Sequence, residues 1–99
     1  MEITIVKEGD TDIFLISGRI DTITHTQLSD KILQSFKKCK SLILDFEKVQ
    51  YISSAGLRSL IIGHKTAVSK GGVMELRNVN PSVMSVLNTV GFSKMLNIK

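Results

Sequence analysis

Residues 41–58, with the sequence SLILDFEKVQYISSAGLR, combine a strand signal with the start of a helix. The first six, Ser41–Phe46, form a nearly continuous apolar run, which is typical of a strand covered on both faces or paired in parallel. Residues 47–51 are more polar and predict a connection. A helix is then expected from Ser53 or Ser54 to the Gly71-Gly72 pair, because the apolar residues that follow the serines recur at helical spacing.

The residues before this stretch predict a hairpin and a first helix. Alternating apolar residues at 3 and 5 and an apolar run at 13–16 predict two antiparallel strands, joined by a turn at Glu8-Gly9-Asp10. A helix is expected to follow and to end near Cys39, because Leu28, Ile32 and Phe36 recur every four residues. The residues expected to cap its N-terminus are Asp21, Thr22 or Thr24.

The residues after this stretch predict one more strand–helix–strand unit. Residues 73–76 form a short strand, and Asn80-Pro81 has the cap and first-position residues of a helix. Residues 95–98 predict a last short strand. The expected order is therefore ββαβαβαβ, a single α/β domain over residues 1–99 with amphipathic helices and a mixed sheet opened by an antiparallel hairpin.

Composition narrows the class of protein. The chain has 99 residues, 42% of them hydrophobic and 22% charged, which suits one globular domain with little room for a deep substrate cavity. No apolar run approaches the ~20 residues of a membrane-spanning helix, and the start at Met1-Glu2-Ile3-Thr4 does not resemble a signal peptide. The lone Cys39 predicts a reducing cytoplasm.

Charge and reactive residues favour a binding protein over an enzyme. The net charge is +4, and its densest basic group, Lys37, Lys38 and Lys40, lies where cations suit a helix C-terminus, so no nucleic-acid ligand is expected. The two histidines, His25 and His64, have no cysteine or carboxylate motif around them, so neither a metal nor a cofactor is expected. A nucleophile elbow and a Walker loop are both absent from the sequence.

The pair Ser53-Ser54 has two interpretations from residue types alone. Either serine could cap the helix, with Gly56 allowing close packing. Alternatively, one serine is a modification site, because the free N–H groups and the dipole of a helix N-terminus stabilise added negative charge. A phosphate there would leave the fold intact and change only the exposed surface.

A series of short segments stands in order along the chain: Gly18-Arg19-Ile20-Asp21, Leu42–Phe46, Ser53-Ser54-Ala55-Gly56-Leu57-Arg58, Gly71-Gly72, Asn80-Pro81-Ser82-Val83 and Val90-Gly91-Phe92. Taken together, these segments resemble the landmarks of the STAS domain family, in particular its anti-sigma factor antagonists. The similarity spans almost the whole chain and implies a protein-binding switch.

The resemblance implies which residues would act. In phosphorylated members the modified residue lies two positions before a Gly-Leu pair, which points to Ser54, with Ser53 as a secondary candidate. The implied partners are an anti-sigma factor with serine kinase activity and a phosphatase of the PP2C type. The residues expected to contact the partner are Asp21, Thr22, Thr24, Ser53, Ser54, Ala55, Gly56 and Arg58.

Two further expectations concern assembly. The alternative function is that of a constitutive STAS subunit of a lipid-transport ATPase complex, which would bind its partner whatever the state of Ser54. Many antagonists continue into a further C-terminal helix, whereas this sequence stops soon after Gly91-Phe92. Apolar surface left uncovered there makes a weak homodimer plausible.

Overall fold

Five strands form one mixed sheet whose spatial order follows the sequence. The computed structural model describes all residues from Met1 to Lys99. The strands are β1 (Glu2–Glu8), β2 (Thr11–Ile20), β3 (Ser41–Ile52), β4 (Val73–Arg77) and β5 (Asn97–Ile98). The β1–β2 pair is antiparallel and the other pairs are parallel, so the expected hairpin and mixed sheet are confirmed.

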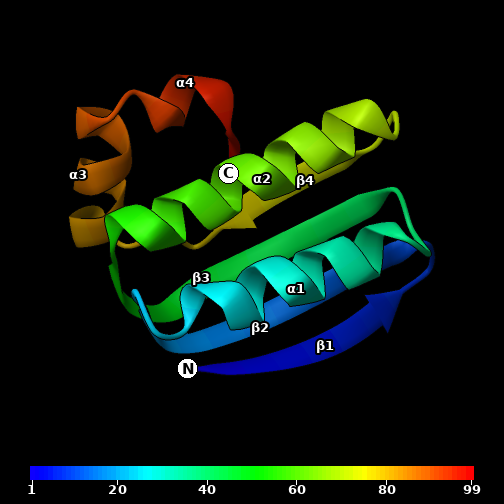
Figure 1. Cartoon of the computed structure of the whole chain (residues 1–99), viewed down its shortest axis with the longest axis horizontal. Coiled ribbons are helices and arrows are strands. Elements are labelled where there is room, and N and C mark those ends of the chain that lie inside the picture. The colour runs from blue at the N-terminus through cyan, green and yellow to red at the C-terminus, as the bar shows by residue number, and fades with distance from the viewer.

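Four helices connect the parallel strands: α1 (His25–Phe36), α2 (Ser54–Ser69), α3 (Pro81–Thr89) and α4 (Phe92–Met95). Right-handed crossovers that add strands in one direction place their helices on one face of the sheet. Figure 1 shows α1 and α2 side by side on that face, with α3 and α4 beyond α2. The order matches the expected ββαβαβαβ, apart from the single-turn helix α4, which precedes β5.

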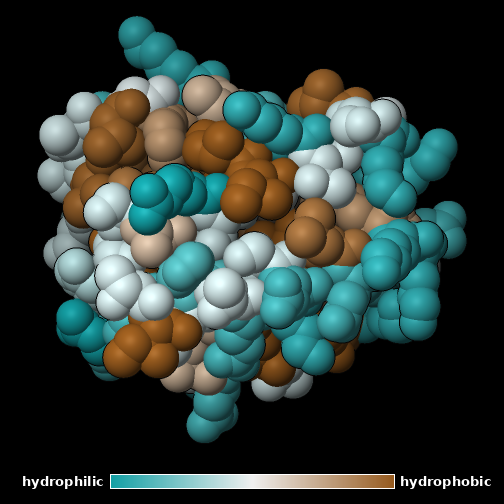
Figure 2. Space-filling view, in the orientation of Figure 1, coloured by the Kyte–Doolittle hydropathy of each residue, from teal (hydrophilic) through white to brown (hydrophobic).

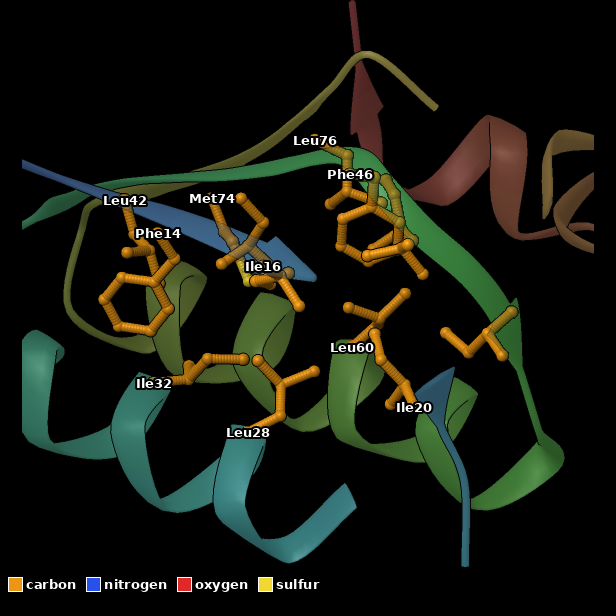
Figure 3. Packing of buried hydrophobic residues seen from close by; sticks show 14 of the residues in the cluster. Phe14, Ile16, Ile20, Leu28, Ile32, Leu42, Phe46, Leu60, Met74 and Leu76 are labelled. Carbon is orange, nitrogen blue, oxygen red and sulfur yellow. The ribbon is translucent and has the colours of Figure 1, made fainter. Parts of the chain in front are cut away.

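The core lies between this helical layer and the sheet. In Figure 3, Phe14 and Ile16 of β2 and Met74 of β4 point toward Leu28 and Ile32 of α1. All five are essentially buried, and they belong to one cluster of 19 residues. In α2 the sequence spacing predicts an apolar stripe of Leu57, Leu60, Ile61, His64 and Val68; Leu57 and Leu60 are buried, whereas Val68 is exposed and Ala67 is buried instead.

Residues 47–51 belong to β3, so the predicted connection is wrong. The partner that extends the strand is β2, since β3 pairs with β4 only over residues 41–45 but stays paired with β2 as far as Ile52. Two register shifts against β2 lie within this part of β3. At the first, the Asp45 carboxylate accepts a hydrogen bond from the Glu47 N–H at 2.9 Å. Pairing with a distant strand therefore overrides the polar local sequence.

A buried carboxylate joins the hairpin to α1. Asp12 accepts hydrogen bonds from the Ser35 hydroxyl at 2.6 Å and from the Lys7 ammonium at 2.9 Å. The Ser35 bond is the main cause that holds the pKa of Asp12 below its usual value; the Lys7 contact adds to it and burial opposes it. The lowered pKa means that the charged form stabilises the fold above about pH 4, and that this contribution is lost as pH falls through the folded-state pKa.

We expect Asp12→Asn to lower the free energy of unfolding by about 1–3 kcal/mol at pH 7, because it removes a charge-assisted bond from a buried site. The difference from wild type should shrink as pH falls below about 4. Urea unfolding at pH 7 and at pH 3 measures both effects. Asp10→Asn, an exposed carboxylate without an ion pair, is the matched control. If the free energies of unfolding of wild type and Asp12→Asn differed by the same amount at both pH values, the stabilising effect of the charged Asp12 carboxylate would be contradicted.

Candidate functional site

The two serines of the loop between β3 and α2 have different surroundings. Ser53 is the extended N-cap residue of α2, and its hydroxyl accepts a hydrogen bond from the Gly56 N–H at 3.2 Å. Ser54 is the first residue of the helix, is exposed, and its hydroxyl makes no hydrogen bond within the protein. The capping function therefore belongs to Ser53, and the hydroxyl of Ser54 is free.

The start of α2 is held tightly on the ends of β2 and β3. The Ser53 N–H donates to the Ile20 carbonyl oxygen at 2.8 Å. A Cβ atom at Gly56 would lie 2.7 Å from side-chain carbons of both Ile20 and Ile52, so only glycine allows this approach. Ser54 is thus presented from a rigid corner, where a change of charge alters the surface more than the fold.

The turn after β2 lies beside this corner and is closed by its own side chains. The Asp21 carboxylate accepts hydrogen bonds from the Ile23 and Thr24 N–H groups, each at 3.0 Å. These bonds, that of Thr24 first, hold the pKa of Asp21 below its usual value. The Thr24 hydroxyl lies 2.8 Å from the Arg19 carbonyl oxygen, to which it donates. Asp21 therefore caps this turn, and α1 itself begins at His25 after an N-cap, Thr24, that makes no side-chain capping bond.

Two exposed apolar side chains stand out at this end of the sheet. Ile23, at the tip of the Asp21 turn, is 83% exposed, the highest value among the large hydrophobic residues. Tyr51, near the end of β3, is 41% exposed, and the Arg19 guanidinium lies 4.2 Å from its ring centre. The sequence alone did not identify Ile23, Tyr51 or Arg19 as candidate site residues. The one local signal concerned Ile23, which stands between two threonines just before the first predicted helix and has no strand or helix face to fill.

The eight residues predicted for partner contact fall into two groups. Thr22, Ser54 and Arg58 are exposed, and Arg58 lies one helical turn after Ser54 on the same face of α2. Ala55 and Gly56 are buried, Ser53 and Thr24 are partly exposed, and the hydrogen bonds of Asp21 and Thr24 lie within the turn. The two loops are brought together, since Ser53 bonds to Ile20, the residue before Asp21.

Hydrogen bonds between the helices fix the two halves of this surface relative to each other. The Ser59 hydroxyl of α2 donates to the carbonyl oxygen of His25 at 3.0 Å and lies 3.2 Å from the Ser29 hydroxyl of α1. Ser59 is buried, so these bonds are shielded from water. The Asp21 turn and the Ser54 corner are therefore held close together, and we call their exposed residues the Ser54 surface: Thr22, Ile23, Ser54 and Arg58.

The Ser54 surface offers a free nucleophilic hydroxyl but no catalytic cluster around it. No group of three or more histidine, cysteine, aspartate or glutamate residues gathers anywhere in the chain. The imidazole Nδ1 of His64 is buried without a hydrogen-bond partner, and His64 lies about three turns along α2 from Ser54. None of the helices is both long and apolar enough to cross a bilayer. The hydroxyl of Ser54 is therefore accessible, and no side chain of the fold holds it in a hydrogen bond.

Comparison with known proteins agrees with the fold. An anti-sigma F factor antagonist from Paenibacillus polymyxa is 29% identical over 86 residues, which cover 84% of this chain and 73% of that protein. An anti-sigma factor antagonist from Mycobacterium paratuberculosis superposes with a TM-score of 0.87 at 18% identity, covering 98% of this chain and 83% of the other.

A Bacillus protein is also similar in structure. The phosphorylated form of the cell fate determinant SpoIIAA superposes with a TM-score of 0.78 at 17% identity, over 99% of this chain and 91% of the other. The family model for the STAS domain matches residues 2–99, which is nearly the full sequence. The chain therefore belongs to the STAS domain family.

Proposed function

We propose that this protein is an anti-sigma factor antagonist that is switched off by phosphorylation of Ser54. The unmodified form binds an anti-sigma factor with serine kinase activity and so releases the target of that factor. The single observation that carries the proposal is the free, exposed hydroxyl of Ser54, which the fold does not use because Ser53 makes the capping bond. The anti-sigma F factor antagonist of P. polymyxa supports the class of partner.

Charge explains how a phosphate on Ser54 would act. It adds about −1.5 to −2 charges at neutral pH and lies at the positive end of α2, so the fold tolerates it. Binding a partner over Ser54 would then remove that charge from water, at a cost of several kcal/mol unless a cation of the partner meets it. Each 1.4 kcal/mol is about tenfold in affinity, so a single modification is enough to switch binding.

The cycle needs two enzymes besides this chain. The anti-sigma factor donates the phosphoryl group of ATP to the Ser54 oxygen, and a PP2C-type phosphatase hydrolyses the product and restores the binding form. This chain is the substrate in both steps and acts as a binding protein, not an enzyme. We propose that it works in the cytoplasm, where ATP and the sigma factor's polymerase are found.

The direct test is to incubate the protein with the anti-sigma factor from the same genome and Mg-ATP, and to map the product by mass spectrometry. One phosphate on the peptide that holds Ser54, absent from Ser54→Ala, supports the proposal. Phosphate on Ser53 alone would show that Ser53, and not Ser54, is the phosphorylation site. Tight binding without phosphorylation, equal for wild type and Ser54→Asp, would favour the constitutive subunit of a lipid-transport complex.

Ile23 tests the contact surface independently of the switch. We expect Ile23→Ala to weaken binding of the anti-sigma factor by about 10- to 100-fold, because a rigidly held apolar side chain at the centre of an interface often acts as an anchor. Stability should stay within about 0.5 kcal/mol of wild type, since the side chain contributes little to the core. Titration calorimetry and thermal melting measure the two effects. Val68→Ala, an exposed apolar residue near the C-terminal end of α2, is the control, and equal affinities for the two variants would remove Ile23 from the interface.

A further inference from the structure

Positive charge is concentrated in the two long helices and the residues that follow them. Residues 25–40 and 54–70 contain seven lysines and arginines but one acidic residue, Asp30, which gives a net charge of +6. The whole chain carries +4, so the remaining residues carry a net charge of −2. The two long helices and the residues that follow them are therefore strongly basic, whereas the rest of the chain is slightly acidic.

Much of this charge meets at one end of the helical layer. Four exposed lysines, together with Phe36 and the partly exposed Cys39, line a hollow of about 260 Å³ at the C-terminal ends of α1 and α2: Lys37, Lys38, Lys40 and Lys70. No carboxylate is among the residues that line it. Hydrophilic residues crowd the end of the molecule where these helix ends lie in Figure 1, as Figure 2 shows. We call this the lysine end.

The fold gives these four lysines no anionic partner. The two ion pairs of the molecule are Lys7–Asp12 and Arg77–Glu75. Lysines near a helix C-terminus often serve its free carbonyl groups. In this protein, backbone N–H groups already donate to several carbonyl oxygens at the C-terminal ends of α1 and α2, including those of Ser35 and Ala67. Like charges held around one hollow repel, so an anion bound there would relieve the repulsion.

Exposed apolar side chains border the lysine end. Leu33 of α1 is 39% exposed and lies one helical turn before Lys37 on the same face. Val68 of α2 is 64% exposed and lies two residues before Lys70. A nucleic acid backbone would neutralise the lysines but leave these side chains without an apolar environment. The boundary of an anionic bilayer supplies phosphate groups for the lysines and acyl chains for the two apolar tips.

We propose that the lysine end docks the protein on an anionic phospholipid surface, with Leu33 and Val68 entering the headgroup region. The helix α2 is about 24 Å long, so the lysine end and the Ser54 surface lie at opposite ends of it. Docking therefore leaves the Ser54 surface accessible and does not depend on phosphate there. The inference stands apart from the proposed function, because it uses neither Ser54 nor an anti-sigma factor.

The test is co-sedimentation of the full chain with vesicles of phosphatidylcholine containing 30% phosphatidylglycerol, beside vesicles of phosphatidylcholine alone. We expect binding to the anionic vesicles only, weakened as salt rises from 50 to 300 mM. Each lysine near an anionic surface contributes about a fivefold gain in binding. The triple variant Lys37→Glu, Lys38→Glu, Lys70→Glu should therefore bind the anionic vesicles at least about 100-fold more weakly than wild type does.

A charge-matched variant separates the lysine end from net charge. Lys48→Glu, Lys94→Glu, Lys99→Glu changes the total charge equally but lies outside the lysine end, and it should bind nearly as wild type does. Leu33→Ser, Val68→Ser keeps every charge, should melt as wild type does, and should lose the part of binding that survives high salt. Equal loss in the two charge variants, no preference for anionic vesicles, or binding to polyglutamate but not to vesicles would each overturn the proposal.

Discussion

Ser54→Asp is expected to weaken binding of the cognate anti-sigma factor by at least about 100-fold, which corresponds to about 2.7 kcal/mol. The carboxylate adds one negative charge where the partner must exclude water, and phosphate would add more. Ser54→Ala should bind as wild type does, because the hydroxyl makes no hydrogen bond within the fold. Titration calorimetry with the unmodified anti-sigma factor, in the absence of ATP, gives the three dissociation constants.

Two controls make this result specific. Gln34→Glu adds the same charge on α1 away from the Ser54 surface, and it should leave affinity unchanged. Thermal melting of Ser54→Asp should show no loss of stability, since an anion in the first turn of a helix stabilises it by about 0.3–1 kcal/mol. Equal affinities for Ser54→Asp and Ser54→Ala would show that the partner does not cover this residue.

Gly72→Ala is expected to produce the largest loss of stability, about 3 kcal/mol. A Cβ atom at this position would lie 2.1 Å from the carbonyl oxygen of Lys40, which is backbone and cannot rotate away. That oxygen accepts the Val73 N–H at 2.7 Å, so moving it disrupts the start of the β3–β4 pairing. Overpacking of this kind costs about 1–3 kcal/mol or more. The melting temperature should fall by more than about 10 °C.

Gly63→Ala is the matched comparison for this effect. Its Cβ would lie 2.7 Å from the thioether sulfur of Met74 and 3.1 Å from a methyl carbon of Ile32, which are side-chain atoms that adjust more readily than a backbone carbonyl does. Alanine also favours a helix over glycine by about 1 kcal/mol, which offsets part of the crowding. The free energy of unfolding should therefore change by no more than about 1 kcal/mol. Equal losses in the free energy of unfolding for Gly72→Ala and Gly63→Ala would show that a clash with backbone costs no more than a clash with a side chain.

The elements with strong local signals were predictable from sequence, and those set by distant pairing were not. Asn80 caps α3, its side chain accepting the Val83 N–H at 2.9 Å, and Pro81 opens the helix, as the sequence predicts. The second half of β3 was missed because its residues are polar, with Val49 the buried exception before Tyr51. These residues adopt a strand conformation because they pair with β2, and a pairing with a distant strand leaves no pattern in the local sequence.

The candidate site shows the same division. The segment 53–58 was identified from its small residues and its place at the start of a helix, but the sequence left open which serine caps α2. That choice depends on the extended backbone of Ser53 and its bond to Gly56, which only the structure describes. Ile23 was missed because its exposure depends on the turn that Asp21 closes, and the Arg19–Tyr51 pair was missed because it depends on the register between β2 and β3.

The division of tasks between Ser53 and Ser54 affects how such a switch evolves. Selection for stability acts on position 53, where serine, threonine, aspartate or asparagine can cap the helix. Position 54 carries no such demand, so its residue is free to follow selection on signalling alone. Under the proposed phosphorylation of Ser54, a lineage would therefore acquire, lose or permanently fix the regulated state through single substitutions at one site, without first accumulating compensating changes in the core.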